Sequence, residues 1–377
     1  MQMQTIHLSE VITDIAAGPF GSNLKVSCFV DDGFPIIDGA NLKGMKVTDN
    51  ITKYVTEEKA RSLHRSIAKR NDVVVTISGT LGQIAYIPFD SKYEEYLCSQ
   101  RQFRVTFDTT KVYVPYLVFY FHTYEGQNKI LSFANQVGVP ALSQPLKNFR
   151  QIEISIPTLK EQKKIASIIE SINGKIERNT AINDNLEQQA QAIYTQYFIK
   201  NKAPNWKLGQ LSDLVLVKYG KDHKKLADGI YPVYGSGGIM RYVERPLYTG
   251  ESVLIPRKGT LNNVTYVNGS FWSVDTMFYT EMLHPNVAKY VYLFLKSRDL
   301  ASLNAGSAVP SMTTNILNAM QIYIPDKKVL AYFEEAVSPL YLTIQKNEEQ
   351  SSTLVELRDA LLPKLMSGEL DVSAVNL

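Results

Sequence analysis

One stretch of this chain occurs twice, at a constant separation of 168 residues (156 against 324), and both copies have the pattern of a long helix. The matched residues are Ile156-Pro157 with Ile324-Pro325, Ile176 with Ile344, Asn179 with Asn347, Leu186 with Leu354, and Ala192 with Ala360. A repeat in the sequence predicts a repeat in the architecture. We therefore expect the order globular unit, helix, globular unit, helix.

Both copies place apolar side chains in alternating steps of four and three, which is the a/d pattern of a coiled coil. The seam of the first copy is Ile165, Ile169, Ile172, Ile176, Asn179, Asn183, Leu186, Ala190, Ile193 and Tyr197, and that of the second is Phe333, Val337, Leu340, Ile344, Asn347, Ser351, Leu354, Arg358, Leu361 and Leu365. Both seams become polar at the same point. Because buried polar a/d residues fix register and partner, we expect the two copies to pair, antiparallel. The alternative is an ordinary amphipathic helix that packs on its own domain.

The predicted helices have clear start signals and several candidate breaks. Thr158 and Glu161 form a capping box before the first helix, and Asp326 is a good N-cap residue before the second. Gly174 and Pro339 each weaken a helix, so either arm could be kinked or split there, and Pro363 predicts an end or bend near it.

The two globular units are also related to each other, more distantly. Residues 72–87 and 252–267 both have the pattern strand, tight turn, strand, with Gly79 and Gly259 at the turns. Helical patterns lie between such strands, and the apolar segments 152–154 and 322–324 close the units. The predicted fold class is α+β (mixed α/β): two globular domains related by an internal repeat and separated by two long antiparallel coiled-coil helices.

Composition excludes several classes of protein. The 377 residues predict two or three domains. No uninterrupted apolar run is long enough to span a membrane, and the first residues do not have the pattern of a signal peptide. Cys28 and Cys98 are isolated, form no zinc pattern and indicate a reducing compartment. We expect a cytoplasmic protein with no membrane contact, metal or other cofactor.

Charge is distributed unevenly along the chain. Residues 203–323 carry 12 basic and 8 acidic side chains, whereas residues 324–377 carry 5 basic and 9 acidic ones. The first of these segments permits contact with nucleic acid, while the acidic tail argues against contact between the last helix and phosphate. An ordinary mixed surface explains the same distribution.

Several local segments, in this order around two repeated helices, resemble the specificity subunit of type I restriction–modification systems. They are Gly18-Pro19-Phe20-Gly21-Ser22-Asn23-Leu24, Ile156-Pro157 with Glu161-Gln162, Tyr231-Pro232-Val233-Tyr234-Gly235-Ser236-Gly237-Gly238, Phe271-Trp272-Ser273-Val274-Asp275-Thr276 and Leu361-Leu362-Pro363-Lys364-Leu365. The resemblance covers essentially the whole chain. It implies target recognition domains at 1–157 and 202–325, and conserved spacer helices at 158–201 and 326–377.

The resemblance further implies a non-catalytic subunit that recognises a bipartite, asymmetric sequence in double-stranded DNA. Its expected partners are two methyltransferase subunits, docked on the helices, and restriction/translocase subunits that join for cleavage. If the first helix breaks near Gly174, its longer piece matches one turn of B-DNA, and half-sites are expected about one turn apart.

Candidate DNA-binding residues are polar and basic side chains in turn-rich segments, because such groups supply phosphate and base contacts. In the first unit they are Ser22, Asn23, Lys25, Asn41, Lys43 and Gln83, and in the second Lys218, Tyr219, Lys221, His223, Lys224, Lys225, Arg241, Arg257, Lys258, Asn262 and Asn263. A plain turn or a solvated loop explains many of them equally well. Gly79, Gly259 and Trp272 are expected to be structural.

Motifs for catalysis are missing from the sequence. There is no Pro-Pro dipeptide for an amino-methyltransferase motif, and no Walker A loop for an ATP-driven motor. Met240 occupies the position of the last glycine of a dinucleotide motif, and Asp326 is better explained as a cap than as part of a nuclease motif. The competing hypothesis from another class is a coiled-coil assembly scaffold that binds protein only.

Overall fold

The computed structural model describes residues 2–135, 138–303 and 310–373. It divides into two compact units, Met1–Glu177 with Ser351–Leu377, and Arg178–Gln350. We call them the first and the second unit. Each contains a mixed α/β body together with stretches of two long helices, and the predicted fold class is confirmed.

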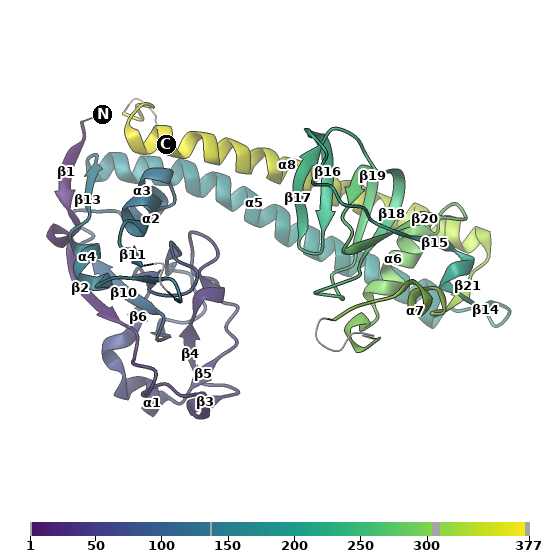
Figure 1. Cartoon of the computed structure of the whole chain (residues 1–377), viewed down its shortest axis with the longest axis horizontal. Coiled ribbons are helices and arrows are strands. Elements are labelled where there is room, and N and C mark those ends of the chain that lie inside the picture. The colour runs from purple at the N-terminus through teal and green to yellow at the C-terminus, as the bar shows by residue number, and fades with distance from the viewer. Residues whose placement is uncertain (1, 136–137, 304–309, 374–377) are drawn as a thin grey trace. The chain divides into compact units, whose positions relative to one another are not determined.

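The two long helices are α5, Leu159–Tyr194, and α8, Lys327–Ser367, drawn in teal and yellow in Figure 1. A π-helical segment, Thr195–Lys200, extends α5. The predicted capping box is present, because the backbone N–H of Thr158 donates to Glu161 Oε2 at 3.0 Å and the backbone N–H of Glu161 donates to Thr158 Oγ1 at 3.4 Å. α8 begins directly after Asp326.

The predicted breaks do not occur. α5 is unbroken at Gly174, and α8 continues through both Pro339 and Pro363. Packing outweighs the local penalty, because buried side chains flank these positions: Val337 and Tyr341 around Pro339, and Leu362 and Leu365 around Pro363. An unbroken α5 of 36 residues is about 54 Å long. The prediction of a shorter helix is therefore wrong, and the expected half-site spacing of one DNA turn loses the basis on which it was made.

α5 and α8 run antiparallel in both units, as predicted. In the second unit, Asn179 Nδ2 donates to the Asn347 carbonyl at 3.3 Å and to Gln350 Oε1 at 2.9 Å, and Asn347 Nδ2 donates to Asn183 Oδ1 at 2.8 Å. The two polar steps of the repeat thus meet each other. They fix the register, since a shift would leave the buried amide of Asn179 and the half-buried amides of Asn183 and Asn347 unpaired.

In the first unit the same pairing continues. Arg358 Nη1 donates to Asn173 Oδ1 at 3.3 Å, and Lys164 Nζ donates to the carbonyls of Val372 at 3.3 Å and Ser373 at 2.9 Å. The buried seam residues are Ile165, Ile169, Ile172, Asn179, Ala190, Phe333, Val337, Ile344 and Leu365. The half-buried ones are Ile176, Asn183, Leu186, Ile193, Tyr197, Leu340, Asn347, Ser351, Leu354, Arg358 and Leu361.

The first unit contains two main sheets. One is antiparallel with strand order β2-β10-β7-β8, and the other has the order β3-β5-β4-β9-β6 with β4 and β9 parallel. Two short pairs, β1-β13 and β11-β12, complete it. The strands are β1 Gln4–His7, β2 Ile12–Ala17, β3 Phe29–Val30, β4 Phe34–Ile37, β5 Tyr54–Val55, β6 Ile67–Lys69, β7 Val73–Thr76, β8 Ile84–Tyr86, β9 Glu95–Cys98, β10 Gln102–Phe107, β11 Ala134–Asn135, β12 Ala141–Leu142 and β13 Glu153–Ile156. The helices are α1 Glu57–Ser62, α2 Val114–Phe121, α3 Tyr124–Leu131 and α4 Pro145–Arg150.

The second unit contains one six-stranded sheet, with order β15-β20-β18-β19-β16-β17 and a single parallel pair, β16 and β19. The pair β14-β21 corresponds to β1-β13 of the first unit. The strands are β14 Lys207–Gln210, β15 Val215–Tyr219, β16 Asp228–Gly235, β17 Gly238–Val243, β18 Tyr248–Pro256, β19 Thr265–Ser273, β20 Met277–Met282 and β21 Gln321–Ile324. In addition to its parts of α5 and α8, this unit contains the helices α6, Ala288–Lys296, and α7, Thr314–Asn318.

Each body uses the long helices to complete its apolar core. In the first unit, Ile165 and Ile169 of α5 and Leu365 of α8 belong to the same buried cluster as the aromatic residues of α2. In the second unit, Tyr194 of α5 and Phe333 of α8 belong to the cluster that contains Tyr290 of α6.

A buried charged cluster ties three elements of the second unit together. Lys289 of α6, whose side chain is 5% exposed, lies 2.8 Å from Glu251 Oε1 on β18 and 2.5 Å from Glu334 Oε1 on α8. Burial works to raise the pKa of Glu251, but hydrogen bonds from Lys289 and Tyr266 outweigh it and leave that pKa below its usual range. The body and α8 are thus joined by charge as well as by apolar contact.

Lys289→Met should lower the free energy of unfolding by about 3–5 kcal/mol, because two partly buried carboxylates then lose the cation that they share. Urea unfolding at neutral pH measures the effect. Since the pKa of Glu251 is lowered in the folded protein, this stabilisation is present at neutral pH and is lost as the pH falls through that pKa.

The matched control is Lys328→Met, which removes the same charge from an exposed position. Its effect should stay within about 0.5 kcal/mol. Equal losses for the two variants would show that the charged cluster does not hold α8 to the body.

Candidate nucleic-acid interface

In each unit a loop begins at an equivalent point of the sheet, directly after β2 in the first unit and directly after β15 in the second. The Gly18 N–H donates to the Gln102 carbonyl at 2.8 Å, and the Gly220 N–H donates to the Met277 carbonyl at 3.0 Å. An added Cβ would overlap the Ser99 carbonyl oxygen at Gly18 and the corresponding Val274 oxygen at Gly220. Only glycine permits this close approach.

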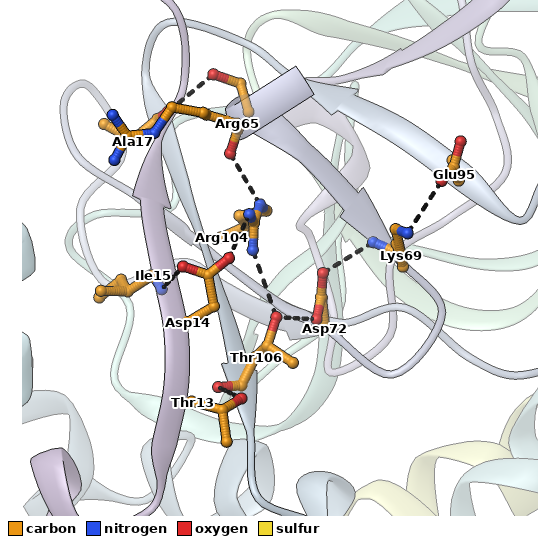
Figure 2. Close-up of polar contacts among 11 residues, drawn as sticks. Thr13, Asp14, Ile15, Ala17, Arg65, Lys69, Asp72, Glu95, Arg104 and Thr106 are labelled. Carbon is orange, nitrogen blue, oxygen red and sulfur yellow. Dashed lines mark hydrogen bonds and ion pairs between the residues drawn. The ribbon is translucent and has the colours of Figure 1, made fainter. Parts of the chain in front are cut away.

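A polar network fixes the start of the first loop, as Figure 2 shows. Arg104 on β10 donates to the Arg65 carbonyl at 3.0 Å and to Asp14 Oδ2 on β2 at 2.6 Å. The hydrogen bond from Arg104 lowers the pKa of Asp14. Ser66 Oγ donates to the Ala17 carbonyl at 2.9 Å, directly before Gly18. The loop therefore leaves from a rigid base.

Beyond this base, the predicted polar residues of the first loop face solvent. Ser22, Asn23 and Lys25 are exposed, as is Lys43 in a later segment. The Asn23 N–H donates to the Phe20 carbonyl at 2.8 Å, which closes a turn. These four side chains are accessible to a ligand.

Asn41 differs from these four, because its side chain is buried and the geometry gives its predicted contact with DNA no support. It is 3% exposed. Its Nδ2 donates to the carbonyls of Thr48 at 3.2 Å and Asn50 at 3.1 Å, and its Oδ1 accepts from the Asp38 N–H at 3.1 Å. All the bonds it needs lie within the protein, so Asn41 shapes the loop that carries Lys43.

Gln83 is half-buried at the wall of a pocket of about 630 Å³. Its Oε1 accepts from Thr76 Oγ1 at 3.0 Å, and its Nε2 donates to the Gly39 carbonyl at 3.0 Å. The same pocket is lined by Gly79 and Gln102. Gln83 thus holds two walls of the pocket together, and these two bonds use one of its two N–H donors and one of its two acceptor lone pairs.

Arg101 also lines this pocket, and no local sequence pattern pointed to it. It is exposed, and its Nη1 lies 3.8 Å from the position that a Cβ on Gly79 would take. In the described part of the chain it forms no ion pair. Its guanidinium is therefore available at the rim of the pocket.

In the second unit, the basic loop after Gly220 is anchored near both ends, at Lys221 and at Leu226, whose carbonyl accepts from Arg241 Nη2 at 3.0 Å. The Lys221 N–H donates to the Ser273 carbonyl at 2.8 Å, and Trp272 Nε1 donates to the Lys221 carbonyl at 2.8 Å. Trp272 is 7% exposed, so it belongs to the core as expected. The lysines Lys218, Lys221, Lys224 and Lys225 are exposed, whereas His223 is half-buried.

Tyr219 connects this loop to the turn after β18. Its ring is 51% exposed, packs against Phe278 at 5.0 Å, and has the guanidinium carbon of Arg257 5.6 Å from its centroid. Lys258, the next residue, is exposed. The fold thereby brings two of the predicted residues, Tyr219 and Arg257, into contact.

Three other predicted residues of this unit are engaged within the protein. Arg241 Nη2 pairs with Asp228 at 2.7 Å and donates to the Leu226 carbonyl at 3.0 Å. Asn262 Nδ2 donates to Asp299 Oδ1 at 2.9 Å, and Asn263 Nδ2 donates to the Ser236 carbonyl. These side chains brace loops, and their predicted contact with DNA has no support from the geometry.

Two features bear on other classes of function. Among the described residues, no group of three or more His, Cys, Asp or Glu side chains could hold a metal ion. In the same residues, no helix is long and apolar enough to cross a membrane.

The chain is thus a twice-repeated α/β protein whose bodies present polar loops and share two long helices. The family model for the type I restriction modification DNA specificity domain matches residues 22–188 and 204–349. The chain belongs to this family, and the role that the family defines is DNA-sequence specificity in a type I restriction–modification system.

Individual relatives agree with this assignment. The chain is 22% identical over 362 residues to the type I restriction enzyme MjaIX specificity subunit of Methanocaldococcus jannaschii, covering 84% of this chain and 82% of that protein. It is 23% identical over 321 residues to a putative type I specificity subunit of Mycoplasma pneumoniae, covering 78% and 83%. The crystal structure of a type I S subunit from M. genitalium superimposes with a TM-score of 0.60 at 16% identity, covering 97% and 96% of the two chains, and shares the fold.

Gly18→Ala should lower the free energy of unfolding by at least about 2 kcal/mol, because the new methyl group meets backbone atoms that cannot move aside. Gly220→Ala should do the same. Gly44→Ala is the matched control, since nothing lies within 4 Å of a Cβ there. Thermal and urea unfolding measure all three, and a Gly18→Ala protein as stable as the control would contradict the proposed close approach.

Proposed function

We propose that this chain recognises a bipartite, asymmetric sequence in double-stranded DNA, with one half recognised by each body. The recognition domains are residues 1–157 and 202–325. The observation that carries the proposal is that both bodies repeat one backbone frame, with Gly18 matching Gly220, but expose different polar side chains on it. Because the two bodies share this backbone but expose different side chains, each can contact a different half of an asymmetric DNA sequence.

The helical segments 158–201 and 326–377 serve as spacers and dock two methyltransferase subunits, with restriction/translocase subunits joining for cleavage. The repeated helix sequences support two equivalent docking sites. Methyl transfer and cleavage belong to those partners, and this chain supplies specificity without catalysis.

Exchange of residues 203–323 for the corresponding segment of a relative should change one half of the methylated motif and leave the other half intact. The chain is co-expressed with its methyltransferase in an unmethylated host, and methylated bases are mapped across the genome. The distance between the methylated bases of the two half-sites gives the spacing directly.

Two controls make this experiment decisive. Omission of the chain should abolish the bipartite motif, and the unmodified chain should restore it. If the complex forms and stays in solution but methylates no bipartite motif, the competing scaffold hypothesis gains and DNA recognition by this chain fails.

DNA binding by the complex should weaken steeply with salt, because lysine contacts to phosphate release counterions. Lys221→Ala, Lys224→Ala and Lys225→Ala together should make the slope of log affinity against log salt shallower by up to about 2.7, since each phosphate contact contributes about 0.9. Fluorescence anisotropy between roughly 50 and 200 mM salt measures the slope.

Lys327→Ala with Lys328→Ala is the control, because these exposed lysines lie at the start of α8, outside the proposed recognition domains. An unchanged slope in the triple variant would remove the basic loop from the interface. If the affinity of the complex for DNA does not change with salt concentration, the scaffold hypothesis is favoured.

A further inference from the structure

We propose that each recognition domain identifies a guanine with one arginine held at its glycine turn, Arg101 in the first unit and Arg257 in the second. This assignment rests on the proposed function. It goes further because it names the residues that determine specificity and the base that each one contacts.

The two glycine turns are structurally equivalent. The Gly79 N–H donates to the Pro140 carbonyl at 3.0 Å, and the Gly259 N–H donates to the Pro310 carbonyl at 3.2 Å. Both glycines have a positive φ, 98° and 87°, which other residues rarely adopt. The preceding residues also correspond, because Ser78 and Lys258 each form an isolated bridge to the segment that follows the proline.

Arg257 lies two residues before its glycine and has an unsatisfied side chain. Its backbone N–H donates to the Thr276 carbonyl at 2.9 Å, which fixes the main chain. Its Nε is buried and has no hydrogen-bond partner among the described residues, which also provide no ion pair for it. The half-exposed ring of Tyr219 supports the guanidinium from one side. An arginine held in this way retains donors for a ligand.

Arg101 reaches the equivalent turn from a different position in the chain. Its carbonyl accepts from the Ile77 N–H at 2.7 Å, so Ile77 takes the backbone position of Arg257, and Arg101 takes that of Thr276. The same correspondence follows from the next strand, where the Leu142 N–H donates to Ile77 and the Met312 N–H to Arg257. In both units one backbone hydrogen bond joins these two positions. The arginine is the acceptor residue of that bond in the first unit and the donor residue in the second.

Two other arginines, one in each body, contrast with this pair. Arg104 and Arg241 are held by the carboxylates of Asp14 and Asp228 and act as braces. A free guanidinium on a rigid turn matches guanine, whose O6 and N7 accept two parallel N–H bonds in the major groove. Lys258 beside Arg257 is exposed and suited to the adjacent phosphate.

The test uses the complete complex and two single variants, Arg101→Gln and Arg257→Gln. Each should relax one G·C position of the methylated motif, Arg101→Gln in one half and Arg257→Gln in the other. Affinity for the cognate duplex should fall roughly ten- to a hundredfold, with little change for unrelated DNA. Arg245→Gln, which removes an exposed charge from the second unit, is the matched control and should leave the motif unchanged.

Arg257→Lys separates charge from geometry. Loss of G·C preference in this variant supports a bidentate contact, whereas a fully retained motif overturns it. The proposal is also overturned if both glutamine variants keep the parent motif, or if the relaxed position is an A·T pair. If the unmodified chain directs no bipartite motif, the proposed function itself has failed, which is a distinguishable result.

Discussion

Each body of this protein depends on helical residues from two distant parts of the chain to close its core. In the first unit, Ile165 from α5 and Leu365 from α8 are buried in one cluster, and in the second, Tyr194 and Phe333 have the same role. Neither body is therefore complete without both helices. Apolar burial of this kind stabilises only one alignment of the helices, and the amides of Asn179 and Asn347 specify it. The side chains proposed to contact DNA therefore belong to bodies whose cores include residues of both helices.

Much of the fold could be predicted from the sequence, because both copies of the helix carry one periodic pattern with polar positions in register. The antiparallel pairing and the contact of Asn347 with Asn183 follow from that pattern alone. The breaks at Gly174, Pro339 and Pro363 could not be judged in the same way. Local propensity predicts a weakened helix there, but the buried neighbours that override it become visible only in the packed structure.

The candidate interface was less predictable. Exposed lysines after Gly220 follow from composition. The burial of Asn41 depends instead on how its own loop folds back onto it, and the ion pair of Arg241 depends on the pairing of two strands. A polar residue beside a turn gives no sign of whether its bonds are directed inward or outward. Arg101 was missed for the opposite reason, because its significance comes from the Gly79 turn, 22 residues away, which lies next to it only in the fold.

Repetition of the backbone and divergence of the side chains have different physical origins. Gly18, Gly220, Gly79 and Gly259 are constrained by close backbone approach or positive φ, so the frame tolerates little change. The positions of Ile77 and Arg101, or of Arg257 and Thr276, differ only in side chains that project from a fixed main chain. A guanidinium can be moved from one side of the turn to the other without disturbing the hydrogen bonds that hold the turn. Under the proposed function, such a backbone would allow recognition to change in one body without a change in the other body or in the helices.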